Sequence, residues 1–118
     1  MHIVETLLET ARLDTDLLSR NDRRGDDFSR VRPVDFILLA PDREKADVVA
    51  EFIDDCRYGR ARVEETGGEF RIQVVIEMPT TQSVLCAVSG LMACVAELFD
   101  VRYDGWGCVL QTKPVGSA

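Results

Sequence analysis

The stretch from Phe70 to Met78 alternates regularly between two sets of side chains over nine residues. Alternation with a period of two places successive side chains on opposite faces of a β-strand. The apolar set is Phe70, Ile72, Val74, Ile76 and Met78, and the opposite set is Arg71, Gln73, Val75 and Glu77. The stretch therefore predicts a half-buried strand, and the rest of the chain has to supply a sheet with a covered face.

The other patterns complete a strand–helix–strand–strand–helix–strand order. The predicted segments are a strand over Val34–Ala40, a helix capped by Asp42 and ended near Gly59, a charged edge strand over Arg60–Glu65, a turn at Gly67–Gly68, the alternating strand, a helix from Thr80 or Thr81 to about Phe99, and a strand over Phe99–Leu110. This order predicts an α+β fold, the ferredoxin-like split βαββαβ sandwich, with two helices on one face of a four-stranded antiparallel sheet. The first and third strands are expected to be central, because they are the most apolar.

An additional amphipathic helix is predicted from His2 to Ser19, since apolar residues recur there at helical spacing. The segment Arg20–Arg32 that follows is rich in charge and contains Gly25. Its arginines suggest a phosphate site, but neighbouring aspartates offset them, so a solvated connector is favoured. The predicted division is residues 1–32 for helix and connector, 33–112 for the ferredoxin-like domain and 113–118 for a flexible tail.

Composition narrows the class of protein. The 118 residues are 46% hydrophobic and 30% charged, with a net charge of −7, which describes one soluble domain and disfavours a phosphate-binding surface. The four cysteines have no metal-ligand spacing and are expected to be reduced and buried in a cytoplasmic protein. The uncharged run before Phe99 has only thirteen strongly apolar residues, Val84–Ala96, and is read as a core helix and not as a membrane span.

Catalytic and nucleic-acid-binding patterns are missing from the sequence. The single histidine, His2, argues against His-based catalysis and most zinc sites, and no phosphate-binding glycine loop is found. RNA-recognition domains share the predicted topology but stack bases on aromatic residues of the central strands, which this chain lacks. We expect no enzyme activity, no cofactor, no metal and no direct nucleic-acid binding.

The segment Phe99–Gly107 contains the only tryptophan, Trp106, and the glycines Gly105 and Gly107. Glycine within a strand often marks a bulge or a close backbone approach. Trp106 can therefore be a packing residue against bare backbone. It can equally be a partner contact together with Tyr103 and Asp104, because Trp and Tyr are frequent at binding hot spots.

An acidic ridge is predicted on the first helix of the domain, at spacing i, i+4, i+7 and i+8. Its members are Asp47, Glu51, Asp54 and Asp55. A solvated helix face is the simpler interpretation, and a docking ridge for a basic partner is the functional one. Apolar surface is left over on the second helix of the domain and on the open face of the sheet. The N-terminal helix could cover one of these surfaces and a second subunit the other, which suggests a homodimer.

The sequence Phe99-Asp100-Val101-Arg102-Tyr103-Asp104-Gly105-Trp106-Gly107 resembles the closing motif of the ribonuclease E inhibitor B family of bacterial regulators. The resemblance implies a ferredoxin-like fold and a non-catalytic protein that binds an endoribonuclease of the ribonuclease E type and changes which RNAs it degrades. The expected partner surface combines Tyr103, Asp104 and Trp106 with the acidic ridge. A small-ligand-binding dimeric module, or a domain that serves assembly alone, is the alternative.

Overall fold

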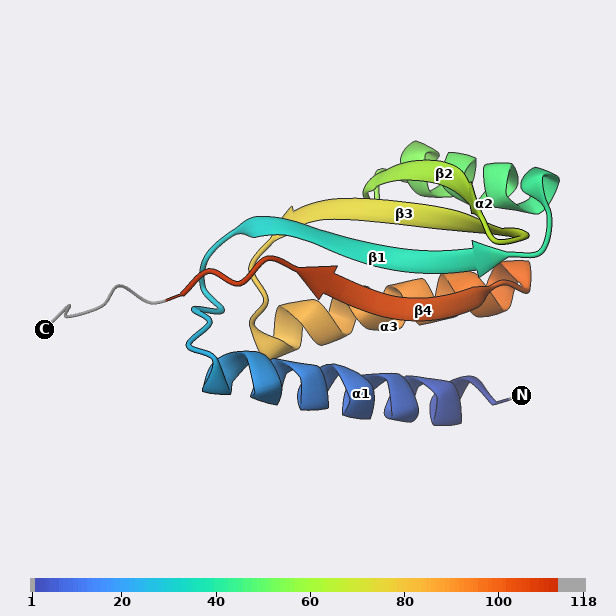
Figure 1. The fold of residues 1–118 in the computed structure, drawn as a ribbon. Helices are drawn as coiled ribbons and strands as arrows, with labels where there is room; N and C mark the ends of the chain where they lie inside the picture. Colours follow the sequence, from blue (N-terminus) through green and yellow to red (C-terminus); the bar gives the residue numbers. More distant parts are fainter. Residues whose placement is uncertain (1, 113–118) are drawn as a thin grey trace, which may run out of the picture.

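The computed structural model describes residues 2–112 and contains three helices and four strands. In chain order they are α1 (Ile3–Arg23), β1 (Arg32–Ala40), α2 (Arg43–Asp55), β2 (Arg60–Thr66), β3 (Glu69–Met78), α3 (Gln82–Phe99) and β4 (Arg102–Cys108). The strands form one antiparallel sheet in the order β2-β3-β1-β4 (Figure 1). This confirms the predicted split βαββαβ fold with an N-terminal helix. The predicted tail, 113–118, lies outside the described residues.

The core lies between one face of the sheet and the helices α2 and α3. Alternate residues of β1, from Val34 to Ala40, are completely buried, and Phe36 pairs with Val74 of β3 in the sheet register. Ile72 and Val74 are also fully buried, as the alternating pattern predicts. The intervening residues of β1 and β3 are only partly covered, so the opposite face of the sheet is open.

The helix α1 packs against α3 on the side away from the sheet (Figure 1). The two helices are antiparallel: Gln82 at the start of α3 donates a hydrogen bond to Thr15, and Leu7 lies beside Gly90. This arrangement explains why α3 is apolar nearly all round, because the sheet covers one side and α1 covers another. α3 is long and apolar enough to cross a membrane by composition alone, but here it has the position of a core helix.

Several boundaries differ from the predicted ones. α1 continues to Arg23 instead of ending at Ser19. β4 begins at Arg102 and not at Phe99, because Phe99 is the last residue of α3. Asp100 caps that helix with a left-handed backbone (φ +56°). After α2 the left-handed residue is Arg57 and not Gly59. Gly59 is needed for close packing, since a Cβ there would lie 2.7 Å from Cγ1 of Val74.

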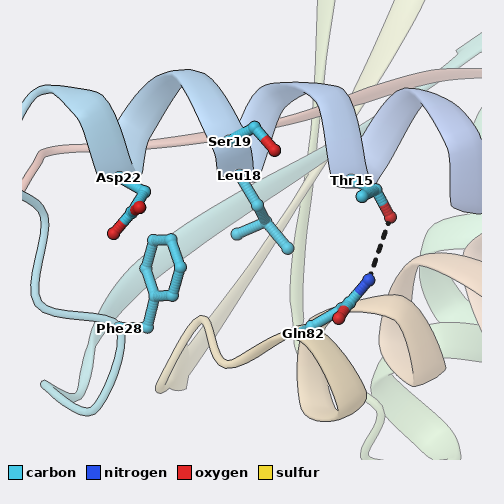
Figure 2. Close-up of a pocket in the computed structure, with 6 residues that line it drawn as sticks. All are labelled: Thr15, Leu18, Ser19, Asp22, Phe28 and Gln82. Carbon is cyan, nitrogen blue, oxygen red and sulfur yellow. Dashed lines mark hydrogen bonds between the residues drawn. The ribbon is translucent and has the colours of Figure 1, made fainter.

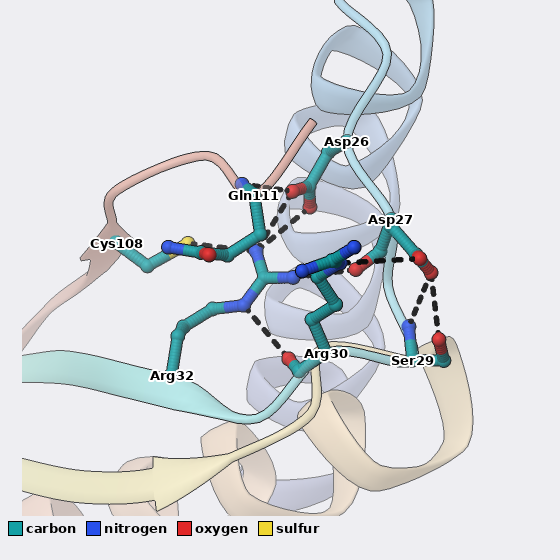
Figure 3. Close-up of polar contacts among 7 residues, drawn as sticks. All are labelled: Asp26, Asp27, Ser29, Arg30, Arg32, Cys108 and Gln111. Carbon is teal, nitrogen blue, oxygen red and sulfur yellow. Dashed lines mark hydrogen bonds and ion pairs between the residues drawn. The ribbon is translucent and has the colours of Figure 1, made fainter. Parts of the chain in front are cut away.

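The connector is only in part the solvated loop that its charge predicts, because it contains a buried ion pair. Asp26 and Arg32 are 1% and 2% exposed, and the Arg32 Nη1 donates to both carboxylate oxygens of Asp26 at 2.8 and 3.0 Å. Arg32 also donates to the carbonyl oxygens of Arg30 and Asp27 (Figure 3).

The prediction that the cysteines are buried was wrong in part, because Cys56 and Cys94 are exposed. All four cysteines are free thiols, as expected.

Candidate functional site

The motif on β4 contains a β-bulge. Trp106 pairs with Phe36 of β1 and Tyr103 pairs with Leu38, so three steps on β4 match two steps on β1. Gly105 within this interval has φ +88°, a conformation that favours glycine. Residues 103 and 106 would face opposite sides of a regular strand. The bulge instead turns both aromatic side chains toward the helices, and this explains the glycine between them.

Trp106 is a buried residue that joins β4 to α1. Its side chain is 9% exposed, and its Nε1 donates a hydrogen bond of 3.0 Å to the Oδ1 of Asp14. The Tyr103 hydroxyl lies 2.7 Å from the Ser89 hydroxyl of α3. Burial raises the pKa of the Tyr103 hydroxyl, so this group stays protonated and available as a donor. The closing motif therefore links three elements of the fold.

Asp14 is the polar residue at the centre of this contact and is 4% exposed. Burial raises the pKa of its carboxyl, and the Trp106 N–H and the nearby Ser89 hydroxyl offset part of that effect. Sequence reasoning missed Asp14. The signal was present, because Leu7, Asp14 and Leu18 follow one helical stripe and place a carboxylate where an apolar residue is expected.

Asp104 is the one of the three predicted contact residues on β4 that is open to solvent. It is exposed on β4, whereas Tyr103 is half-buried and Trp106 is buried. Next to it, Arg102 reaches the carboxylate of Glu69 at 3.5 Å. A partner that approaches β4 would therefore meet Asp104 and Arg102 before the aromatic rings.

The acidic ridge lies on the solvent side of α2, and its four carboxylates are not equivalent. Asp47 pairs with Arg43 at 3.3 Å, and Asp54 accepts a hydrogen bond of 2.9 Å from the backbone N–H of Ala61 at the start of β2. Within residues 2–112, Glu51 and Asp55 form no ion pair and remain exposed. Asp54 thus has a structural contact, while the other three are available to a partner.

The structure does not bring the ridge together with Tyr103, Asp104 and Trp106 of the closing motif. α2 packs mainly on β2 and β3, whereas β4 forms the opposite edge of the sheet and packs against α3. The two halves of the expected partner surface are therefore separate surfaces of one molecule.

An aromatic cluster lies beside the ridge and was not predicted. The rings of Phe52 and Phe99 meet edge-on with centroids 5.0 Å apart, and Tyr58 adds a second edge-on contact to Phe52 at 6.0 Å. Val48 is 49% exposed and lines a surface pocket of about 310 Å³ together with Phe99. α2 therefore presents carboxylates and partly exposed apolar side chains on adjoining surfaces.

Among residues 2–112, no three histidine, cysteine, aspartate or glutamate side chains are grouped closely enough to bind a metal ion. The single histidine, His2, lies exposed at the start of α1. The arrangement of polar groups described above favours protein contacts and internal packing.

In a comparison with protein families the chain matches a family model over residues 12–108, from the middle of α1 to the end of β4. The matched family is described as regulator of ribonuclease activity B, which confirms the resemblance seen in the closing motif. No curated protein matches the chain. The match covers most of the chain and all four strands, and the chain therefore belongs to the regulator of ribonuclease activity B family.

Proposed function

We propose that this protein regulates an endoribonuclease of the ribonuclease E type by binding it as a protein partner in the bacterial cytoplasm. It carries out no reaction and makes no direct contact with RNA. Membership of a family of ribonuclease regulators supports this proposal. The net charge of −7 also supports it, because an acidic surface attracts basic proteins and repels nucleic acid.

The proposal rests mainly on one observation, that the outer surface of α2 presents exposed carboxylates beside partly exposed apolar side chains. We define the docking surface as the exposed carboxylates Asp47, Glu51 and Asp55, with Val48 and the rings of Phe52, Tyr58 and Phe99 beside them. Partly exposed aromatic residues beside charge are typical of binding hot spots with a polar rim.

The two parts of the docking surface have different roles in binding. The carboxylates increase the rate of encounter with a basic segment, because complementary charge steers association. The apolar side chains supply the contact area that slows dissociation. On β4, Asp104 is retained as a secondary contact, while Trp106 and Tyr103 support the fold.

A binding measurement with matched variants tests this assignment. The triple variant Asp47→Asn/Glu51→Gln/Asp55→Asn is expected to bind a ribonuclease E-type endoribonuclease about tenfold more weakly, mainly through a slower association rate. The control is Glu5→Gln/Asp16→Asn/Asp22→Asn, which removes three exposed carboxylates of α1. This control has the same net charge as the triple variant of α2. Equal losses of affinity in both variants would show that only the overall charge matters. Unchanged affinity in both variants would exclude the α2 surface as the binding site.

A homodimer is the second part of the proposal. Val4, Leu8 and Leu98 are 66%, 68% and 70% exposed, and Ile3 beside Val4 lines one surface pocket with Leu98. Apolar patches of this kind are frequent at interfaces between subunits. Sedimentation velocity should show a dimer that Leu8→Gln/Leu98→Gln converts to monomer. A wild-type monomer at every concentration would contradict this part alone.

A further inference from the structure

The contact between α1 and α3 is partly polar. Of the three buried residues of α1, only Leu18 is apolar, and the other two are Asp14 and Asn21. Small residues of α3 face this contact, including Ser89 and Gly90. Burial of few apolar groups gives little stabilisation, so α1 is held less firmly than the helices on the sheet.

The C-terminal half of α1 borders a surface groove. A pocket of about 230 Å³ lies there between α1, the connector and the start of α3 (Figure 2). Figure 2 shows Asp22 and Phe28 on one side of it and the Thr15–Gln82 hydrogen bond on the other. Ser19, Asp22 and Gln82, which help to line it, are exposed, so this pocket is a groove on the surface along the edge of α1.

The chain directly after this point is fixed. The Asp26 carboxylate accepts hydrogen bonds from Arg32 and from the backbone N–H of Gln111, which follows β4 (Figure 3). Between the end of α1 at Arg23 and this buried pair lies only Arg24–Gly25, and Gly25 has φ +85°. The backbone N–H of Asp26 donates to the carbonyl oxygen of Asn21 at 3.1 Å, so a movement of α1 that turns at Arg24–Gly25 has to break this bond and leaves the connector in place.

The hydrogen bond between Trp106 and Asp14 uses only one of the two carboxylate oxygens of Asp14. The Oδ1 of Asp14 accepts from Trp106, but its Oδ2 is buried and has no partner among the described residues. The groups around it are the Trp106 N–H and Tyr103 hydroxyl of β4, and the Ser89 hydroxyl and Cys86 thiol of α3. Within residues 2–112 no basic side chain pairs with Asp14.

We propose that α1 is a proton-sensitive latch, which detaches from α3 by turning at Arg24–Gly25 and closes more firmly when Asp14 is protonated. A buried carboxylate without a counter-charge favours its neutral form, and protonation lets Oδ2 donate a hydrogen bond where the ionised form leaves an orphan acceptor. Detachment exposes the surface of α3 that α1 covers, including Ser89. The latch does not depend on the ribonuclease partner.

The direction of the pH effect follows from the raised pKa of the Asp14 carboxyl. Asp14 binds its proton more firmly when α1 is closed than when it is detached. Its protonation therefore stabilises the closed state fully below the ordinary pKa of an aspartate, about 3.9. That stabilisation is lost as the pH rises through the higher pKa of the closed state. The latch is therefore tightest in acid and loosest at neutral pH.

Trp106 is the only tryptophan and touches Asp14 directly, so its fluorescence reports the state of the latch. Acrylamide quenching of Trp106 should increase about twofold or more in the wild-type protein as the pH is raised from the acid range, where Asp14 is protonated, to neutral pH. Asp14→Asn keeps an acceptor for Trp106 and cannot ionise, so its quenching should be low and independent of pH. Asp16→Asn, an exposed control on the same helix, should behave as the wild type.

Native-state hydrogen exchange of the wild-type protein provides the second measurement. After correction for intrinsic rates, the amides of α1 should open more readily than those of β1 and β3, and more so at neutral pH. The proposal is overturned if α1 exchanges only through global unfolding, or if Asp14→Asn retains the wild-type dependence on pH. If Asp14→Asn does not fold, the exchange of wild-type α1 decides the question.

Discussion

Trp106→Phe is expected to lower the free energy of unfolding by about 3 kcal/mol. The change removes the N–H that Asp14 accepts, and a hydrogen bond to a charged group contributes ~1.5–3 kcal/mol. The smaller ring also buries less apolar surface, which costs about 1 kcal/mol more. The loss is large compared with a total stability of about 5–15 kcal/mol for a small domain. The bulge at Gly105 makes this bond possible, so the prediction also tests why the motif contains a glycine there.

The assay is urea denaturation followed by far-UV circular dichroism, because the variant has no tryptophan left to fluoresce. The pair Trp106 and Asp14 is examined as a double-mutant cycle with Asp14→Leu. Since Trp106→Phe leaves a buried carboxylate without a partner, the double variant should lose at least about 1.5 kcal/mol less than the sum of the single losses. Losses that add within about 0.5 kcal/mol would refute the contact as described.

Two further stability predictions follow from the same geometry, each measured by denaturation. Gly105→Ala should cost about 1–2 kcal/mol because its backbone has φ +88°, whereas Gly107→Ala, with open space at its Cβ position, should change stability by less than about 0.5 kcal/mol; equal effects would contradict the bulge. Arg32→Met should cost about 3–5 kcal/mol because it leaves the Asp26 carboxylate buried without its cation, and a loss below about 1 kcal/mol would show that the pair is not buried in solution.

The fold could be predicted from the sequence because its signals are local. The alternation over Phe70–Met78, the capping residue Asp42 and the turn at Gly67–Gly68 each depend on neighbours in the chain. In the structure Asp42 accepts a hydrogen bond from the backbone N–H of Lys45 at 2.8 Å, and both glycines of the turn have positive φ. Local agreement of this kind was enough to predict the fold and its two central strands.

The direction of the Trp106 side chain could not be predicted, because it depends on how β4 pairs with β1. The bulge reverses the face on which residue 106 lies, and only the register with Phe36 reveals it. Burial of Asp14 and Asp26 was also missed. The partner of Asp14, Trp106, is 92 residues away in the chain, and Asp26 bonds to Arg32 six residues away and to Gln111 85 residues away. Charged residues are normally read as exposed, so neither burial was expected.

The acidic ridge shows the remaining limit of sequence patterns. Helical spacing correctly placed Asp47, Glu51 and Asp55 together on exposed turns of α2. The spacing gave Asp54 the same role, although its carboxylate bonds to Ala61. The aromatic cluster beside the ridge was not visible, because Phe52 and Phe99 come from helices far apart in the chain. Partner binding by the ridge stays a prediction.

The central claim is that this protein alters the activity of a ribonuclease without cleaving RNA itself. The most direct test is the rate at which a purified ribonuclease E-type endoribonuclease cleaves a labelled RNA as the protein is titrated in. We expect a saturable change in the cleavage rate, absent with the triple variant of Asp47, Glu51 and Asp55, and no cleavage by the protein alone. An unchanged cleavage rate at a large molar excess of the protein, or RNA cleavage in the absence of the endoribonuclease, would contradict the claim.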